Sequence, residues 1–146
     1  MKRLCLGMAI LLCALQLCAC AGEKNPTVDT APATDALTDG ETPLSSDDPL
    51  AITGFVIGES VGEARAVTEK GETRYVIYIT LPVDTDFKRC IANIELAPGA
   101  SVSSQSPCVV DDLGGRPVLN LTLDPRTLIV VNGAKERAYE FEIGLG

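Results

Sequence analysis

Apolar and polar residues alternate with a period of two through much of the chain after residue 50, and this alternation constrains the fold more than any other feature. A period of two matches a β-strand that has one buried face and one solvated face. The same pattern recurs at residues 92–96 and 119–123. Residues 73–81 show it most clearly, with four apolar residues on one face: Tyr75, Ile77, Ile79 and Leu81. The pattern predicts short strands and no helix.

The strongest local signal is the dipeptide Asn132-Gly133 between two apolar runs, at residues 128–131 and 137–143. Asn-Gly at the centre of a turn supplies the positive φ angles that a type I′ turn needs. We therefore predict a β-hairpin here. Weaker strand signals run through residues 52–57, 63–68 and 107–111.

Together these segments predict one all-β domain over residues 50–146, built from about seven short strands. Two packed sheets are the usual way to bury one face of that many amphipathic strands. The prediction is a single antiparallel β-sandwich, with Tyr75 and Tyr139 facing its core.

The composition before residue 50 is different. Residues 20–49 are rich in proline and carry seven acidic residues against one basic residue, Lys24. Few apolar side chains are present to offset the entropy lost when such a segment is ordered. Like charges also keep it extended. We expect a disordered acidic linker in front of the β domain.

The start of the chain has the features of an export signal. Lys2 and Arg3 supply a positive charge, and residues 4–17 form the apolar core. That core is shorter than the roughly twenty apolar residues of a membrane-spanning helix.

The signal ends in Leu17-Cys18-Ala19-Cys20, which resembles the lipobox of bacterial lipoproteins. The resemblance implies that residues 1–19 are removed and that Cys20 receives the lipid. Two or more acyl chains would hold the protein stably to a membrane. The alternative is an ordinary secretory signal, cut after Ala19 or Gly22, that leaves a soluble protein.

The six cysteines fall into groups once Cys20 is assigned to lipid. Three lie in the leader before it, so Cys90 and Cys108 remain in the β domain. An even pair in an exported chain favours a disulfide, and two free buried thiols are the alternative. A metal centre is not expected, because two thiolates and no histidine fall short of the usual ligand set.

Charge and composition argue against several classes of function. The formal net charge is −8, and the chain has neither histidine nor tryptophan. A protein without a basic stripe is a poor partner for nucleic acid. Without histidine, a nucleophile lacks its most common base, so we expect neither an enzyme nor a cofactor.

Two features are candidates for ligand binding. Asp84 and Asp86 offer carboxylates to a calcium ion, which needs about six to eight oxygen ligands. The alternative is that these side chains cap and solvate a turn. Tyr78 lies on the face of its strand opposite the predicted core, so it is the tyrosine expected to be an exposed contact.

Several segments of the β domain resemble a known group of modules. They are residues 51–55, residues 79–86, residues 94–102 and residues 131–141. These segments are similar to immunoglobulin-like or cadherin-like β-sandwich modules of Bacteroidetes-type cell-surface lipoproteins. Val83 stands where those modules usually have glycine, and the cysteine pair is not a general feature of them. The resemblance implies a spacer or an accessory binding module at the outer surface, with no catalytic residues.

The sequence thus predicts a lipid-anchored extracytoplasmic protein, at the outer membrane or cell surface rather than the inner membrane. Its expected role is a non-catalytic binding, adhesion or structural accessory module. Its expected partners are the membrane, through the lipid, and a surface glycan or an envelope protein. The alternative is an assembly subunit of a surface appendage or complex that pairs its edge strands with another chain.

Overall fold

A computed structural model describes residues 40–146. The signal sequence, Cys20 and the predicted linker up to residue 39 lie outside the described residues. Every regular element from residue 40 onward is a strand, which confirms the all-β prediction. No helix in this range is long and apolar enough to cross a membrane.

The strands of the described range are numbered in chain order. They are β1 (Gly40–Pro43), β2 (Ile52–Ile57), β3 (Ser60–Glu69), β4 (Glu72–Leu81), β5 (Cys90–Leu96), β6 (Ser101–Val102), β7 (Val109–Asp112), β8 (Pro117–Leu119), β9 (Thr127–Asn132) and β10 (Lys135–Leu145).

These strands form one hydrogen-bonded sheet. Its order is β6-β9-β10-β4-β3-β2-β5-β8-β7, and β1 pairs with β3 beside this path. All neighbours are antiparallel except β10 and β4, which run parallel. The sheet therefore has more strands than predicted and is not wholly antiparallel. The parallel pair arises because β10, the partner of β9 in a hairpin, also lies beside β4, far earlier in the sequence.

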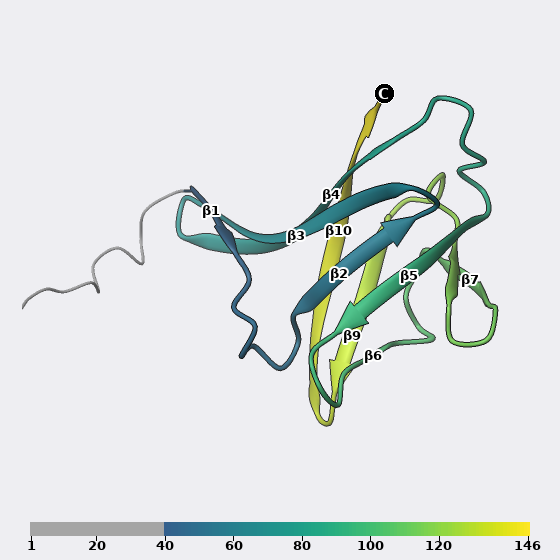
Figure 1. Cartoon of the computed structure of the whole chain (residues 1–146). Helices are drawn as coiled ribbons and strands as arrows, with labels where there is room; N and C mark the ends of the chain where they lie inside the picture. Colours follow the sequence, from purple (N-terminus) through teal and green to yellow (C-terminus); the bar gives the residue numbers. More distant parts are fainter. Residues whose placement is uncertain (1–39) are drawn as a thin grey trace, which may run out of the picture. The chain divides into compact units, whose positions relative to one another are not determined.

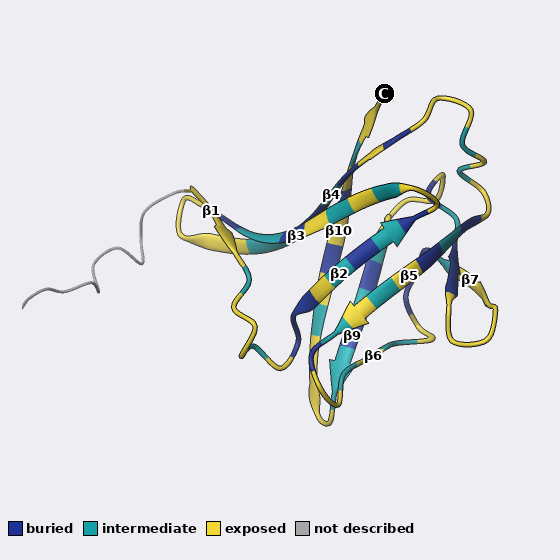
Figure 2. Ribbon diagram, in the orientation of Figure 1, coloured by how far each residue is buried: buried dark blue, intermediate teal, exposed yellow. Residues whose placement is uncertain are grey.

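The sheet curls so that β2 and β5 lie across β9 and β10 (Figure 1). The rings of Phe55 on β2 and Phe141 on β10 have centroids 5.6 Å apart, which places the core between these strands. Buried positions alternate with exposed ones along β2 and β10, as Figure 2 shows. Tyr139 is completely buried and Tyr75 packs against the core, so both predicted core tyrosines face it.

The predicted hairpin is the β9–β10 pair, but its turn is displaced by one residue. Asn132 pairs with Lys135, so Gly133 and Ala134 are the two central residues. Gly133 has a φ of 63°, whereas Asn132 is not among the residues with positive φ. Glycine at the first central position is typical of a type II′ turn, so the type I′ prediction was wrong.

Residues 119–123 do not form the predicted strand. Only Leu119 belongs to β8, and the chain leaves the sheet after it. The amide oxygen of Asn120 accepts hydrogen bonds from the backbone N–H of Thr122, at 3.0 Å, and from its hydroxyl, at 2.7 Å. Such local bonds give the backbone an alternative to ladder pairing, which explains why alternating leucines failed to predict a strand here.

Residues 40–49, which the sequence places in the linker, belong to the folded unit. β1 pairs with β3 from Gly40↔Thr68 to Pro43↔Arg65. The carboxylate of Asp48 also accepts a hydrogen bond from Arg137 on β10. Pairing with a distant strand and an ion pair supply the interactions that local composition did not predict.

The segment from β6 to β7 links two edges of the curled sheet. β6 pairs with β9 at one edge, and β7 pairs with β8 at the other. Between them the buried Ser106 hydroxyl accepts a hydrogen bond from Ile129 N–H, at 2.8 Å, and donates to Ser103 C=O, at 2.7 Å. The Ser106 side chain thus bonds to β9 between two backbone contacts, Ser103 N–H to Ile129 C=O at 2.8 Å and Cys108 N–H to Thr127 C=O at 3.4 Å.

Candidate binding site

A hollow beside Tyr78, which is half-buried, lies along strands β3, β4 and β10. The pairing register places Glu63 of β3, Tyr78 of β4 and Glu142 of β10 in one row across the strands. The hollow has a volume of about 740 Å³ and is lined by residues of these strands and of the loop before β9: Val61, Glu63, Tyr78, Ile79, Thr80, Arg126, Phe141, Glu142, Ile143 and Gly144. It includes the one tyrosine that the sequence predicts to face outward.

Gly144 lines the hollow without a side chain. A Cβ atom there would lie 3.1 Å from the Thr80 hydroxyl oxygen, closer than ordinary van der Waals contact. At the border, Val61 is 75% exposed, which is unusual for a residue of its type in a strand. The hollow is thus lined by a glycine, a hydroxyl group and an exposed apolar side chain.

Tyr78 is held in place by a hydrogen bond to β1. Its hydroxyl donates to the Glu41 carboxylate, and the two oxygens are 2.9 Å apart. Burial raises the pKa of the Tyr78 hydroxyl, and the hydrogen bond to Glu41 raises it further. The phenol is therefore neutral at physiological pH.

Ion pairs fix the charged groups around Tyr78. Arg65 lies 3.0 Å from Glu41 and 2.9 Å from Glu63, measured between nitrogen and oxygen. Arg74 lies 3.3 Å from Glu142 and 3.4 Å from a Glu140 oxygen. All of these side chains are at least one-third exposed, so each pair contributes little stability. Their main effect is to orient carboxylates around an aromatic ring.

The groups that line the hollow offer both stacking and hydrogen bonding. A ring, a hydroxyl and oriented carboxylates can stack on and hydrogen-bond a polar ligand. Within residues 40–146, no group of three or more histidine, cysteine, aspartate or glutamate side chains is arranged to hold a metal ion.

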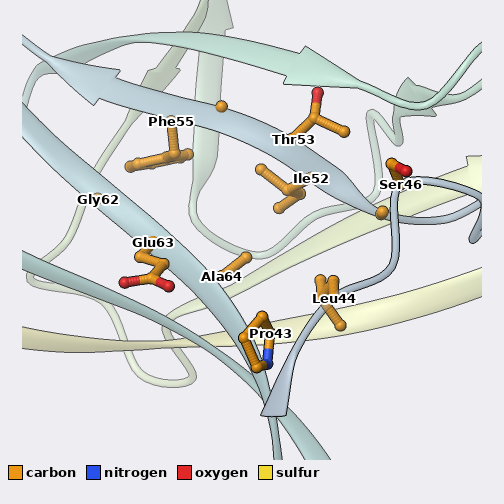
Figure 3. Close-up of a pocket in the computed structure, with 11 residues that line it drawn as sticks. Pro43, Leu44, Ser46, Ile52, Thr53, Phe55, Gly62, Glu63 and Ala64 are labelled. Carbon is orange, nitrogen blue, oxygen red and sulfur yellow. The ribbon is translucent and has the colours of Figure 1, made fainter.

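A second pocket opens where β2 and β3 diverge (Figure 3). Their pairing stops at Phe55↔Gly62, and β3 resumes pairing on that side only at Arg65, with β1. The pocket, of about 270 Å³, reaches the core side chains Ile52 and Phe55. Its volume is below that of most ligand sites.

Asp84 and Asp86 lie in the β4–β5 connection. Asp86 Oδ1 accepts a hydrogen bond from Lys88 N–H, at 3.0 Å, and Asp86 C=O accepts one from Arg89 N–H, also at 3.0 Å. For Asp86, this is the turn-capping arrangement that the sequence offered as the alternative to calcium binding. In the described chain, these two carboxylates are not joined by a third metal-ligating side chain.

Cys90 and Cys108 are both buried free thiols, which corrects the predicted disulfide. Cys90 pairs with Leu119 on one side of β8, while Val109, the residue after Cys108, pairs with Leu119 on the other side. Two strand spacings separate their backbones by roughly 9–10 Å, beyond the ~7 Å limit for a disulfide. The thiols instead face separate carbonyls, those of Asp86 and Thr127.

Sequence reasoning placed Tyr78 outside the core, which is confirmed, but it did not predict the neighbours of Tyr78 in the hollow. Glu142 and Gly144 lie beside Tyr78 and Thr80 only because β10 runs parallel to β4. No local pattern predicts a pairing between strands so far apart in sequence.

Comparisons with models of protein families, with curated proteins and with solved structures found no match to this chain.

Proposed function

We propose that this protein is a lipid-anchored extracytoplasmic accessory module that binds a surface glycan through the hollow around Tyr78. Residues 1–19 act as its signal sequence, Cys20 carries the lipid, and the outer membrane or cell surface is its location. The hollow is the observation that supports binding, because it places an aromatic ring among a hydroxyl and oriented carboxylates. Such groups recognise hydroxyl-rich ligands by stacking and hydrogen bonding.

The proposal includes no catalysis. Glu63 and Glu142 are exposed and paired with arginines, so neither has the apolar surroundings that raise the pKa of a catalytic acid. An envelope protein is the alternative ligand, and it would be recognised by the same surface.

The fold of the module is proposed to be a variant of the immunoglobulin-like sandwich. In support of this, β2 and β5 lie across β9 and β10 (Figure 1), and apolar side chains of these strands share one core. The parallel β4–β10 pair is a departure from a wholly antiparallel sandwich.

The anchor can be tested by lipid labelling in bacterial cells that express the full chain. Wild-type protein is expected to incorporate labelled palmitate and to sediment with membranes. Cys20→Ala should lose the label and appear in the soluble fraction, while Cys18→Ala keeps both properties because Cys18 is not the acceptor. A Cys20→Ala protein that still carries the label would contradict the assignment.

The hollow can be tested by measuring binding of the full-length protein to an array of surface glycans. Tyr78→Ala removes the ring and is expected to weaken binding by at least about tenfold, the scale of a lost aromatic contact. Tyr78→Phe keeps the ring and should retain most of the affinity. Val83→Ala is the control, because Val83 is exposed but does not line the hollow. Equal binding by folded Tyr78→Ala and wild type would rule out the hollow, and binding only to envelope proteins would rule out the glycan.

A further inference from the structure

Three connecting segments lie close together at the end of the sheet where β9 turns into β10 (Figure 1). Asn132 is the last residue of β9, and its Nδ2 donates a hydrogen bond to Pro49 C=O, with 2.8 Å between the two atoms. The same nitrogen donates to Pro98 C=O, at 3.1 Å. Pro49 lies shortly before β2, and Pro98 lies shortly after β5. One carboxamide thus joins the β9–β10 hairpin to two segments that are 83 and 34 residues away from it in the sequence.

The side chain of Asn132 acts only as a donor in these two contacts. Both partners are carbonyl oxygens, which cannot donate, so the amide nitrogen and not the amide oxygen has to face them. An ionised aspartate has no hydrogen to give, and its carboxylate would lie against two carbonyl oxygens. Conversion of Asn132 to aspartate therefore breaks both contacts at once.

Asn120 uses its side chain in the opposite way. Its Oδ1 accepts a hydrogen bond from Thr122 N–H, at 3.0 Å, and another from the Thr122 hydroxyl, at 2.7 Å. A carboxylate oxygen accepts such bonds as well as an amide oxygen does, and its charge strengthens them. Asn120 is thus a matched control, at which the same conversion keeps both contacts.

Gly133 follows Asn132, and this order makes the carboxamide reactive. Because glycine has no Cβ, its backbone can approach the preceding side chain closely. Gly133 is exposed and lies outside the β9–β10 ladder, which ends at Asn132↔Lys135. Its nitrogen is therefore not held in the ladder, whereas the carboxamide that it would attack is held by two hydrogen bonds.

We propose that Asn132 is a site of spontaneous deamidation and that the fold determines when it reacts. The backbone nitrogen of Gly133 gives its proton to a base in the solvent and forms a bond to Cγ of Asn132. The bond from Cγ to Nδ2 breaks, and Nδ2 takes up a proton and leaves as ammonia. Water then opens the cyclic imide at either of its carbonyls, which gives aspartate or isoaspartate. The chain gains a negative charge, and water is the only reactant consumed.

The two hydrogen bonds keep this reaction slow in the folded protein. The carboxamide has to leave the carbonyl oxygens of Pro49 and Pro98 before its Cγ can reach the nitrogen of Gly133. Native proteins open locally in this way, and the reaction rate then follows the population of the open form. Aspartate cannot restore either bond once it has formed. The segments before β2 and after β5 then stay released from the hairpin.

The inference goes beyond the proposed ligand binding and does not depend on it. Asn132 does not line the hollow beside Tyr78, so deamidation and ligand binding can be measured separately. The residues on both sides of Pro49 also bond to β10, through Arg137 and Tyr139. Deamidation thus removes the middle one of three adjacent contacts between this segment and the hairpin.

The first test compares the rate of conversion in folded and unfolded protein. Full-length wild type in detergent is incubated in mildly alkaline buffer with and without urea, and peptide mass mapping follows the replacement of amide by acid. Conversion at Asn132 is expected to be at least about tenfold faster in urea, because the two hydrogen bonds are then absent. Asn120 precedes Leu121 rather than glycine and should change little in either buffer. Equal rates at Asn132 in the two buffers, or no conversion in urea, would overturn the proposal.

The second test introduces the product of the reaction as a substitution. Asn132→Asp should shift the midpoint of unfolding to a lower urea concentration than in wild type, whereas Asn120→Asp should unfold like wild type. Both variants add the same charge, so a difference between them reports the lost donor. Equal midpoints would mean that the contacts of Asn132 do not hold the two segments, which contradicts the proposal. An Asn132→Asp chain that does not fold is the extreme of the expected result, and the rate comparison in wild type needs no variant.

Discussion

Tyr139→Ala is expected to lower the free energy of unfolding by about 3–5 kcal/mol, because it removes a large side chain from a fully packed site. Tyr139 is completely buried, and its ring lies 5.8 Å from that of Tyr75 in an edge-on arrangement. Its hydroxyl donates to Leu50 C=O at 2.6 Å. Tyr139→Phe keeps the ring but leaves that carbonyl without its partner, so a loss of about 1–2 kcal/mol is expected.

The hydroxyl of Tyr139 belongs to a clamp that holds residues 48–50 against β10. Arg137 lies 4.0 Å from the centre of the Tyr75 ring and donates a hydrogen bond to Asp48. Burial of the Asp48 carboxyl opposes its ionisation, but hydrogen bonds from Arg137 and Leu50 N–H together lower its pKa. Contacts with β10 thus hold residues 48–50, the segment that leads into β2.

Urea unfolding of the full-length protein, followed by circular dichroism, measures both effects. Tyr78→Phe is the matched control, since its hydroxyl bonds to Glu41 at the surface, and it should change stability by less than about 0.5 kcal/mol. If Tyr139→Phe were as stable as Tyr78→Phe, the bond to Leu50 would not contribute as described.

The free energy of unfolding is also expected to fall above pH 9, and Cys108 alone accounts for up to about 2.7 kcal/mol of the loss. This figure is a pKa difference of about two units at 1.36 kcal/mol per unit. Burial raises the pKa of the Cys108 thiol from 9.0 to about 11. Unfolding exposes the thiol, which then ionises near its ordinary pKa. The neutral thiol therefore stabilises the fold fully below pH 9, and this contribution is lost as the pH rises from about 9 to about 11.

The measurement compares urea unfolding at pH 8 and pH 10.5 in wild type and in Cys108→Ala. The variant loses stability at both pH values because it creates a cavity, but its further loss at high pH should be smaller than that of wild type. Cys90→Ala is the comparison variant, because burial also raises the pKa of that thiol. An identical pH dependence in wild type and Cys108→Ala would mean that the Cys108 thiol does not titrate, as it could not in a disulfide.

Local patterns predicted most strands well, because each depends on the burial of one face of a short segment. The segment 52–57 coincides with β2, and the tyrosines assigned to the core from alternation do face it. The failures involve interactions that a single segment does not encode. Gly133 rather than Asn132 occupies the first turn position because the register of the whole β9–β10 pair fixes it.

The same reason explains the errors in the linker and in the cysteine pair. Residues 40–43 become a strand only because β3 offers them an edge, and the Tyr78 hydroxyl offers Glu41 a hydrogen bond. Cys90 and Cys108 are an even pair in sequence, but β8 lies between their strands. The hollow could not be predicted because it depends on the parallel alignment of β4 with β10. That alignment brings Gly144 beside Thr80.

The position of β10 also determines when the protein can fold. It is the last strand of the described chain, yet it lies inside the sheet between β9 and β4. Until residues 135–145 are present, β4 has no neighbour on that side and Tyr139 is missing from the core. Pairing between distant segments makes folding slow, so the sheet is completed only after synthesis has passed β10.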